Sequence, residues 1–274
     1  MVKIVSHLII VGVGLLGSSL GLAVKKRGLA DVVIGIDHCR GTLEIAQQRG
    51  AVDVVALDFD DLATINDGLA IICTPVRSIV SHAERIAAVN NHLLLSDVGS
   101  TKANICHAME QHGLRFVGAH PIAGSEKSGP AFGDADLFQD RLTILTPTDS
   151  SRAEDVERLQ FFWESLGSRV LILIPEQHDA YLAKTSHLPH AVAATLASLL
   201  TEADKPFCGT GFADTTRIAS GSPTVWTDIF LENRLQLLAF LEVFSDHLAT
   251  LKIALEGSDE AAIVRFLESA RKSI

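Results

Sequence analysis

A glycine-rich turn near the amino terminus is the first segment of this chain whose residues could take part in chemistry. Residues 12–17 read GVGLLG, between an apolar run that predicts a strand and a segment that predicts a helix. In such a turn Gly12 permits a tight bend, Gly14 lets a pyrophosphate approach the backbone, and Gly17 lets the helix pack closely on the strand. The spacing therefore predicts a dinucleotide site.

The residues around this turn indicate which dinucleotide it binds. The amides of Leu15 and Leu16 lie at the predicted helix amino terminus, where the partial positive charge favours phosphate. Asp37 ends the second predicted strand, and a carboxylate there accepts hydrogen bonds from ribose hydroxyls. Because a 2′-phosphate at that position would meet like charge, we expect NAD rather than NADP, a preference that the neighbouring His38 and Arg40 reduce.

Three later strand ends carry further candidate residues. Thr74 and Pro75 follow one predicted strand, and Ser100 follows the next. Because ligands of open α/β sheets bind beyond the carboxyl ends of strands, we expect Thr74 and Pro75 to line the cofactor and Ser100 to lie near the nicotinamide. His120 lies at the end of the strand after that, where an imidazole can accept a hydroxyl proton near neutral pH while hydride leaves the same carbon. We therefore interpret His120 as a candidate general base.

An alternation of short apolar runs and helical stretches is expected to position these residues. The runs are nearly continuous in their apolar character, which is typical of a parallel sheet covered by helices on both faces. The predicted strands are residues 7–11, 32–36, 52–56, 69–73, 92–95, 114–119, 142–145 and 169–173. The fold class is therefore expected to be α/β, with a Rossmann-type, mostly parallel sheet in the first part of the chain.

The strand pattern ends at Pro175, and everything after it has a helical pattern. Leucine and phenylalanine recur at spacings of three and four over residues 235–255, which predicts a long amphipathic helix, and a last helix is expected over 259–272. We expect two domains: residues 1–175 bind the dinucleotide, and the all-helical residues 176–274 serve substrate binding and dimerisation. Because so few helices cannot bury the leucine stripe, we expect a homodimer through them.

Composition argues against several classes of function. The chain has 33 acidic and 23 basic residues, and its net charge of −10 repels phosphate backbones, so nucleic-acid binding is disfavoured. It contains no run of about 18 uncharged apolar residues that could span a membrane. The amino terminus lacks a signal-peptide cleavage site and the four cysteines form no dense framework, so we expect reduced thiols and a cytoplasmic protein.

Several segments taken together give the sequence a resemblance to a known family. They are GVGLLG at 12–17, DVGSTK at 97–102, GAHPIAGSEKSG at 118–129, SHLPH at 186–190 and TRIASGSPTVWTD at 216–228. Over nearly its whole length the chain resembles the prephenate and arogenate dehydrogenases, or cyclohexadienyl dehydrogenases, of tyrosine biosynthesis. The resemblance implies that hydride passes from a cyclohexadiene substrate to NAD⁺ while its ring carboxylate leaves as carbon dioxide. The products would be 4-hydroxyphenylpyruvate from prephenate or tyrosine from arogenate.

The resemblance also implies roles for residues at the reacting end of the substrate. His120 would accept the proton of the ring hydroxyl, and Ser100 would align it with the nicotinamide. Arg217 would bind the ring carboxylate, and the planar guanidinium of an arginine suits that task because it offers two parallel hydrogen bonds. The substrate is expected to be a small anion.

Three more residues are implied near the substrate side chain. His187 and His190 are candidates for contacts with it, and Glu126 would lie beside the substrate, where it could gate entry. The two histidines, three residues apart, could also be read as metal ligands. No nearby cysteine or carboxylate completes a set with zinc spacing, so we expect no metal.

Two alternative functions remain open at this point. A β-hydroxyacid dehydrogenase would share the nucleotide site and the helical second half, but it would rely on a lysine there, for which Lys184 is the nearest candidate. A non-catalytic NAD-sensing regulator would use the glycine-rich turn and leave His120, Ser100 and Arg217 idle. Turnover of a panel of substrates with NAD⁺ separates the three possibilities.

Overall fold

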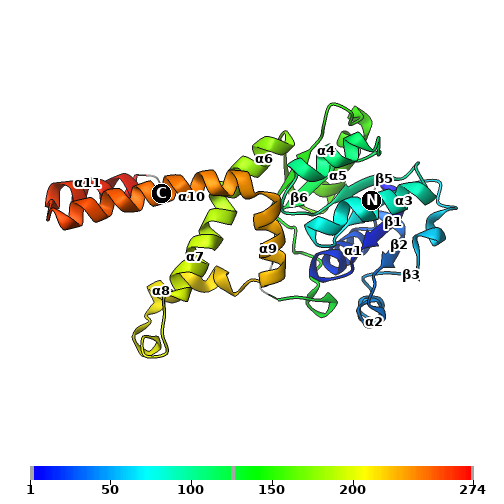
Figure 1. The fold of residues 1–274 in the computed structure, drawn as a ribbon. Coiled ribbons are helices and arrows are strands. Elements are labelled where there is room, and N and C mark those ends of the chain that lie inside the picture. Colours follow the sequence, from blue (N-terminus) through cyan, green and yellow to red (C-terminus); the bar gives the residue numbers. More distant parts are fainter. Residues whose placement is uncertain (1–2, 125–126, 273–274) are drawn as a thin grey trace.

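Five parallel strands form the centre of the amino-terminal domain in a computed structural model that describes residues 3–124 and 127–272 (Figure 1). They run in the order β3-β2-β1-β4-β5, so the direction of winding reverses at β1 and leaves a crevice beyond its carboxyl end. The strands are β1 (Val5–Val11), β2 (Ala30–Ile36), β3 (Val54–Ala56), β4 (Gly68–Ile72) and β5 (Leu94–Asp97).

Helices bury both faces of this sheet. Alternate residues of β1 point to opposite sides, with Leu8 and Ile10 in one apolar cluster and Ile9 and Val11 in the other. The first cluster includes residues of α1, α2 and α5, and the second includes residues of α3 and α4. These helices are α1 (Leu15–Arg27), α2 (Arg40–Gln48), α3 (Ile79–Val89), α4 (Ala103–Gln111) and α5 (Ala153–Ser165). The expectation of a Rossmann-type parallel sheet is confirmed.

A separate three-stranded sheet carries His120. Its strands β6 (Gly118–Pro121), β7 (Leu142–Thr146) and β8 (Arg169–Ile172) lie in that order, antiparallel in the first pair and parallel in the second. The predicted strand over 114–119 was wrong in its bounds, because β6 begins at Gly118 and His120 pairs with Ile144 inside it. Among the described residues a bridge between Leu95 and Phe116 links the two sheets. A short apolar run predicts that a strand forms, but it does not predict which strand pairs with it.

Every element after β8 in the described residues is helical, and the last two helices extend from the sheets as an arm (Figure 1). The helices are α6 (Pro175–Leu182), α7 (Leu188–Ser198), α8 (Thr210–Thr216), α9 (Pro223–Glu232), α10 (Arg234–Glu256) and α11 (Glu260–Arg271). The predicted helices over 235–255 and 259–272 correspond to α10 and α11, so the expectation of an all-helical second domain is confirmed.

A π turn, residues Ala183–His187, joins α6 to α7 without a break in the helix. Pro189 lies in the first turn of α7, where a proline lacks the amide that an α-helix would pair and crowds the preceding turn. A wider π turn accommodates such a residue. His187, in this turn, and His190, just after it, are both buried.

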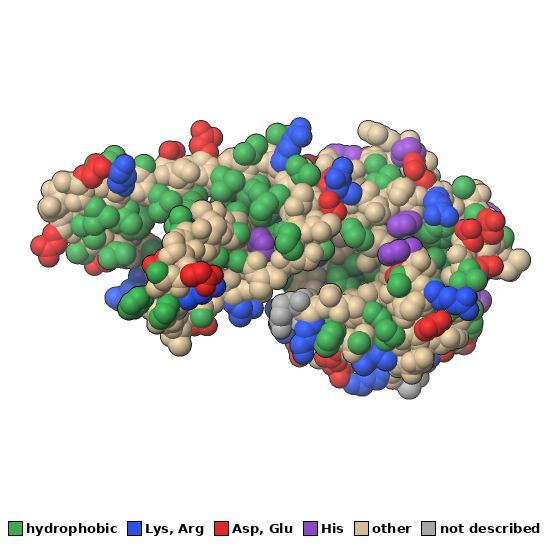
Figure 2. Space-filling model, turned by 60° about the horizontal axis from the view of Figure 1, so that its bottom comes forward, with side chains coloured by type: hydrophobic (Ala, Val, Ile, Leu, Met, Phe, Trp, Pro, Cys, Tyr) green, Lys and Arg blue, Asp and Glu red, His purple; other side chains and the backbone are tan. Residues whose placement is uncertain are grey.

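The apolar stripe of α10 is largely uncovered in the single chain. Leu238, Leu248 and Leu255 are 60%, 50% and 57% exposed. Hydrophobic side chains also gather along the arm of α10 and α11 in the space-filling view (Figure 2). Exposed apolar surface of this extent is typical of an interface.

Candidate active site

Close backbone packing holds the glycine-rich turn between β1 and α1. Gly12 has a φ of +90°, and a Cβ there would lie 3.0 Å from the carbonyl group of Cys73. A Cβ on Gly17 would lie 2.1 Å from the carbonyl oxygen of Gly12, so α1 approaches the turn only because this residue is glycine. At Gly14 a Cβ would meet no atom within 4 Å. That open space at the amino terminus of α1 fits a pyrophosphate.

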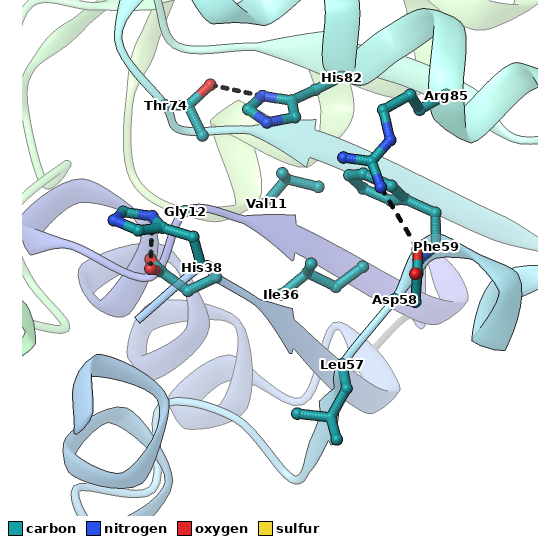
Figure 3. Close-up of a pocket in the computed structure, with 11 residues that line it drawn as sticks. Val11, Gly12, Ile36, His38, Leu57, Asp58, Phe59, Thr74, His82 and Arg85 are labelled. Carbon is teal, nitrogen blue, oxygen red and sulfur yellow. Dashed lines mark hydrogen bonds and ion pairs between the residues drawn. The ribbon is translucent and has the colours of Figure 1, made fainter. Parts of the chain in front are cut away.

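A cavity of about 260 Å³ opens beside the turn, beyond the carboxyl ends of β1, β2 and β4 (Figure 3). Asp37 lines it, and the carboxylate is held by the amides of Val13, at 3.0 Å, and Cys39, at 2.9 Å. The remaining oxygen lone pairs of Asp37 are available to ribose hydroxyls. The other lining residues are Val11, Gly12, Ile36, His38, Leu57, Asp58, Phe59, Thr74, His82 and Arg85.

The basic side chains near Asp37 lie against carboxylates. The exposed His38 lies 3.2 Å from Asp37 itself, and Arg40 lies 3.4 Å from Glu44 on the surface of α2. On the far side of the cavity, Arg85 pairs with Asp58. This charge distribution favours a free ribose over a 2′-phosphate at Asp37.

A second cavity of about 230 Å³ lies between the two domains. Leu16, Thr74, Pro75 and Ser100 all line it, so four of the residues predicted from the sequence meet at one place. Thr74 also lines the first cavity, which makes the two neighbours. Helix α9 closes the other side with Val225, Asp228 and Ile229, and the lining is completed by Cys73, Val76, Val98 and Gly99.

A buried ion pair ties the ends of β5 and β6 together beneath this cavity. Asp97 accepts hydrogen bonds from the ammonium of Lys102, from the amide of Gly99 at 2.8 Å and from the amide of Ala119 at 3.1 Å. Both charged side chains are fully buried. Since Ala119 precedes His120, this pair fixes the position of the candidate base relative to β5. Lys102 is therefore a structural residue.

The imidazole of His120 is nearly buried, with 9% of the residue exposed. Its Nδ1 lies 2.8 Å from Nε2 of His178, and among the described residues its Nε2 has no hydrogen-bond partner. Burial lowers the pKa of His120 well below its usual range, and repulsion from the Lys102 ammonium, and from His178 and His187 whenever they are protonated, lowers it further. The ring is therefore neutral at pH 7, which is the form that can accept a proton.

His178 is in turn held by Asp179. Its Nδ1 lies 2.8 Å from Oδ1 of Asp179, and this carboxylate also accepts the amides of Lys102, at 2.8 Å, and Ala103, at 2.9 Å. These amides belong to the start of α4, so Asp179 also stabilises a helix amino terminus. Burial lowers the pKa of His178, although the hydrogen bond to Asp179 acts in the opposite direction.

His187 and His190 lie on the helical side of the same region. The side-chain amide of Asn233 donates to Nδ1 of His187 at 3.1 Å and to the backbone carbonyl of Asp179 at 2.8 Å. His190 stacks on Trp226, with ring centroids 3.5 Å apart. Burial is the largest effect on the pKa of His187, which is lowered to about 4. Among the described residues, Nε2 of His187 and Nδ1 of His190 are buried polar atoms without partners.

The remaining candidate residues are not drawn into this cluster. Arg217 is exposed on a short helical turn, Arg217–Ser220, and lines neither of the two cavities. Glu126 lies outside the described residues. Lys184, the candidate of the hydroxyacid alternative, is exposed on the π turn.

Four residues of this cluster were missed by the sequence analysis: His178, Asp179, Trp226 and Asn233. The signal for the first two was an adjacent His-Asp pair in the helix that starts at Pro175. Such a pair is common on helix surfaces, and nothing in its spacing connects it to His120 in a different element.

Other kinds of site find no support in the part of the chain that the structure describes. Residues 3–124 and 127–272 contain no group of three or more His, Cys, Asp or Glu side chains placed to hold a metal ion. Over the same ranges, no helix has the length and apolar character needed to cross a membrane.

Two family models together match most of the chain. Residues 20–172 match the nucleotide-binding domain of prephenate dehydrogenase, and residues 174–269 match its dimerization domain. The cyclohexadienyl dehydrogenase of Zymomonas mobilis is 32% identical over 278 residues, which cover 97% of this chain and 94% of the relative. The prephenate dehydrogenase of Bacillus subtilis is 33% identical over 96% of this chain and 74% of its own length.

Solved structures agree with these matches. A prephenate dehydrogenase from Aquifex aeolicus, in complex with hydroxyphenyl propionate and NAD⁺, superposes with a TM-score of 0.91 at 31% identity, over 100% of this chain and 97% of that one. An arogenate dehydrogenase from Synechocystis gives a TM-score of 0.83 at 28% identity, over 97% of this chain and 98% of that one. With both halves matched in sequence and in fold, the chain belongs to the prephenate dehydrogenase family.

Proposed function

We propose that this protein catalyses the NAD-dependent oxidative decarboxylation of prephenate, arogenate or both. The observation that carries the proposal is the match of 97% of the chain to a cyclohexadienyl dehydrogenase that is itself matched over 94% of its length. The buried, neutral His120 gives this match a chemical basis, because the amide of the preceding Ala119 is bonded to Asp97 at the end of β5, and the residues that follow Asp97 line the second cavity.

His120 is the proposed proton acceptor. The substrate ring hydroxyl binds at its Nε2, and the imidazole takes the hydroxyl proton as hydride leaves the same carbon. The bond from the ring to its carboxylate then breaks, its electron pair enters the ring, and carbon dioxide departs from an aromatic product. Ser100 holds the same hydroxyl from the second cavity.

Arg217 is the proposed ligand of the ring carboxylate, and His187 and His190 contact the substrate side chain. Each of these histidines has a buried ring nitrogen without a partner among the described residues, which supports this role because a ligand would complete its hydrogen bonds. Glu126 keeps the place beside the substrate that the family resemblance implies.

NAD⁺, when bound, supplies the hydride acceptor. The amides of Leu15 and Leu16 hold its pyrophosphate over the glycine-rich turn, and Asp37 accepts hydrogen bonds from the adenosine ribose. Thr74 lines both cavities, and Pro75 lines the second. The negative charge of Asp37 makes NADP the weaker cofactor.

The proposed assembly is a homodimer through the carboxyl-terminal helices. The uncovered stripe of α10 and the match of residues 174–269 to a dimerization domain support it. We place the domain boundary at residues 175 and 176, where the strands give way to helices. A cytoplasmic location agrees with four cysteines that are all free thiols.

Turnover with a panel of substrates tests the proposed function. The purified protein is given NAD⁺ with prephenate, arogenate or a series of β-hydroxyacids, and NADH and carbon dioxide are measured together. We expect one carbon dioxide for each NADH with prephenate or arogenate, and the ratio of their kcat/KM values defines the preference. Turnover of a hydroxyacid alone, without carbon dioxide, would replace the proposal with the hydroxyacid alternative, and no turnover of any substrate would favour the NAD-sensing regulator.

A further inference from the structure

We propose that His178 and Asp179 are positioning residues that fix the proton of His120 on Nδ1 and so leave its Nε2 lone pair directed at the substrate. The inference deepens the proposed function and rests on it. It assigns a role to two buried side chains from the helical domain that act on a residue of the second sheet.

The direction of the hydrogen bonds follows from what each group can donate. A carboxylate only accepts, so the 2.8 Å contact between Oδ1 of Asp179 and Nδ1 of His178 requires the proton on that nitrogen. In a neutral imidazole the other nitrogen is then an acceptor. The 2.8 Å contact between Nε2 of His178 and Nδ1 of His120 therefore requires the proton of His120 on Nδ1. The Nε2 of His120 is left with its lone pair.

Both rings are neutral in the resting protein. Burial lowers the pKa of His120 and of His178. The charged groups that act on them include Lys102, whose positive charge lowers both pKa values, and Asp97, which is paired with Lys102. Adding a proton to either ring would thus place a positive charge in a buried site and close to the ammonium of Lys102.

The chain of three residues is anchored at its far end. His178 is fully buried and Asp179 is 4% exposed. Asp179 is held by two amides of α4 through its side chain and by Asn233 through its backbone carbonyl. His178 therefore cannot turn away without breaking buried hydrogen bonds. Its hydrogen bond to His120 in turn fixes the orientation of the His120 ring.

No proton has to travel along the chain of His120, His178 and Asp179. When Nε2 of His120 takes the substrate proton, the ring becomes an imidazolium whose Nδ1–H still donates to Nε2 of His178. His178 keeps its own proton on Nδ1, and the carboxylate of Asp179 offsets the new positive charge across the ring between them. The proton can return to the product oxygen by the same route, so the step is balanced.

The tautomers of the two rings give a test that does not depend on activity. Protein labelled with ¹⁵N in its histidines is assigned with His120→Asn and His178→Gln variants, and long-range ¹H–¹⁵N spectra identify the protonated nitrogen of each ring. We expect the Nδ1–H form for both His120 and His178 at pH 7. The Nε2–H form of either ring would overturn the proposal.

A pair of variants tests the consequence for catalysis. His178→Phe removes the acceptor, and we expect kcat to fall about 100-fold, because a base free to turn is misplaced, while KM for substrate and NAD⁺ changes less than about threefold. His178→Gln retains a carbonyl oxygen for His120 and an amide for Asp179, so it should recover at least about tenfold of that loss. The control His112→Phe alters a surface histidine paired with Glu84 and should leave kcat unchanged.

The alternative outcomes separate the inference from the proposed function. If kcat falls equally in His178→Gln and His178→Phe, His178 is only a packing residue and the proposed positioning role is wrong. The same conclusion follows if these variants raise KM in step with a lower melting temperature. If the wild-type protein uses neither prephenate nor arogenate, the proposed function fails, whereas the tautomer measurement still decides the hydrogen-bond directions.

Discussion

The chemistry proposed for His120 depends on how deeply the ring is buried. A surface histidine would be half protonated near pH 6.5, whereas the low pKa of His120 keeps it neutral and able to accept a proton. The residue is thus tuned by its surroundings and not by its type alone.

The pH dependence of kcat/KM follows from this pKa. Since the neutral ring is the active form and its pKa is lowered, activity should persist as pH falls through 6.5 and be lost only below it. Initial rates of NADH formation between pH 5 and 9 measure this profile. An acidic limb at or above the ordinary histidine pKa would show that His120 is not buried as described.

Arg217 is predicted to act on substrate affinity more than on turnover. Because it is exposed and, among the described residues, makes no ion pair, Arg217→Ala should leave the fold intact. Loss of a charge-assisted hydrogen bond should raise KM for the substrate about 10- to 100-fold. Lys184→Ala is the matched control, and steady-state kinetics of both variants decide the matter. A larger loss with Lys184→Ala would favour the hydroxyacid alternative.

The positions of single site residues could be predicted from the sequence where those residues follow a predicted strand. Thr74, Pro75 and Ser100 follow predicted strands, and they line one cavity as expected of residues at the ends of neighbouring parallel strands. His178 could not be linked to His120 in this way, because 58 residues separate them and only the packing of α6 on the sheets brings them together.

At the scale of elements, the junction of β1 and α1 shows how two glycines of one motif differ. Gly17 is required by the fold, since a Cβ would collide with the backbone of Gly12. Gly14 has open space around it and a φ of −66°, which any residue adopts. Its proposed role is therefore to leave room for the cofactor.

Alanine substitutions at these two positions should separate stability from cofactor binding. Gly17→Ala should lower the melting temperature by several degrees, because α1 must move away from the turn. Gly14→Ala should keep the wild-type melting temperature but weaken NAD⁺ binding about tenfold or more, because its methyl group meets the pyrophosphate. Thermal unfolding and calorimetric titration with NAD⁺ measure both effects. Unchanged NAD⁺ affinity in Gly14→Ala would move the pyrophosphate elsewhere.

The elements themselves could be predicted to different degrees. The five parallel strands were visible as apolar runs, and α10 as a leucine stripe. The division into two sheets was not, because the run that includes Val117 reads the same whichever strand it pairs with. The π turn before Pro189 was equally hidden, since the sequence shows a proline in a helical segment but not how the chain adapts to it.

At the scale of the whole molecule, an acidic protein is proposed to bind an acidic substrate. The net charge of −10 repels such an anion at long range. Local positive groups, namely Arg217 and the helix amino terminus at the glycine-rich turn, must therefore provide the attraction. The net charge could be calculated from the sequence. The location of the positively charged groups that attract the substrate could not, because it depends on the fold and on the second subunit.

The proposed dimer predicts a mass near twice 29.4 kDa in light scattering at micromolar concentration. Leu248→Lys should shift the protein towards monomer, because the two-fold symmetry places a charge in the apolar interface twice. Thr250→Lys, two residues further along the exposed helix, is the control and should remain dimeric. A wild-type monomer would contradict the proposed assembly and leave the stripe of α10 without a partner.

The most direct measurement of the central claim is the turnover of His120→Asn beside its affinity for NAD⁺. Asparagine fits the space of the ring but cannot accept a proton at neutral pH, so kcat should fall roughly 10²- to 10⁴-fold while the affinity for NAD⁺ stays at the wild-type value. A variant that binds NAD⁺ normally and still releases carbon dioxide and NADH at nearly the wild-type rate would contradict the assignment of His120 as the base.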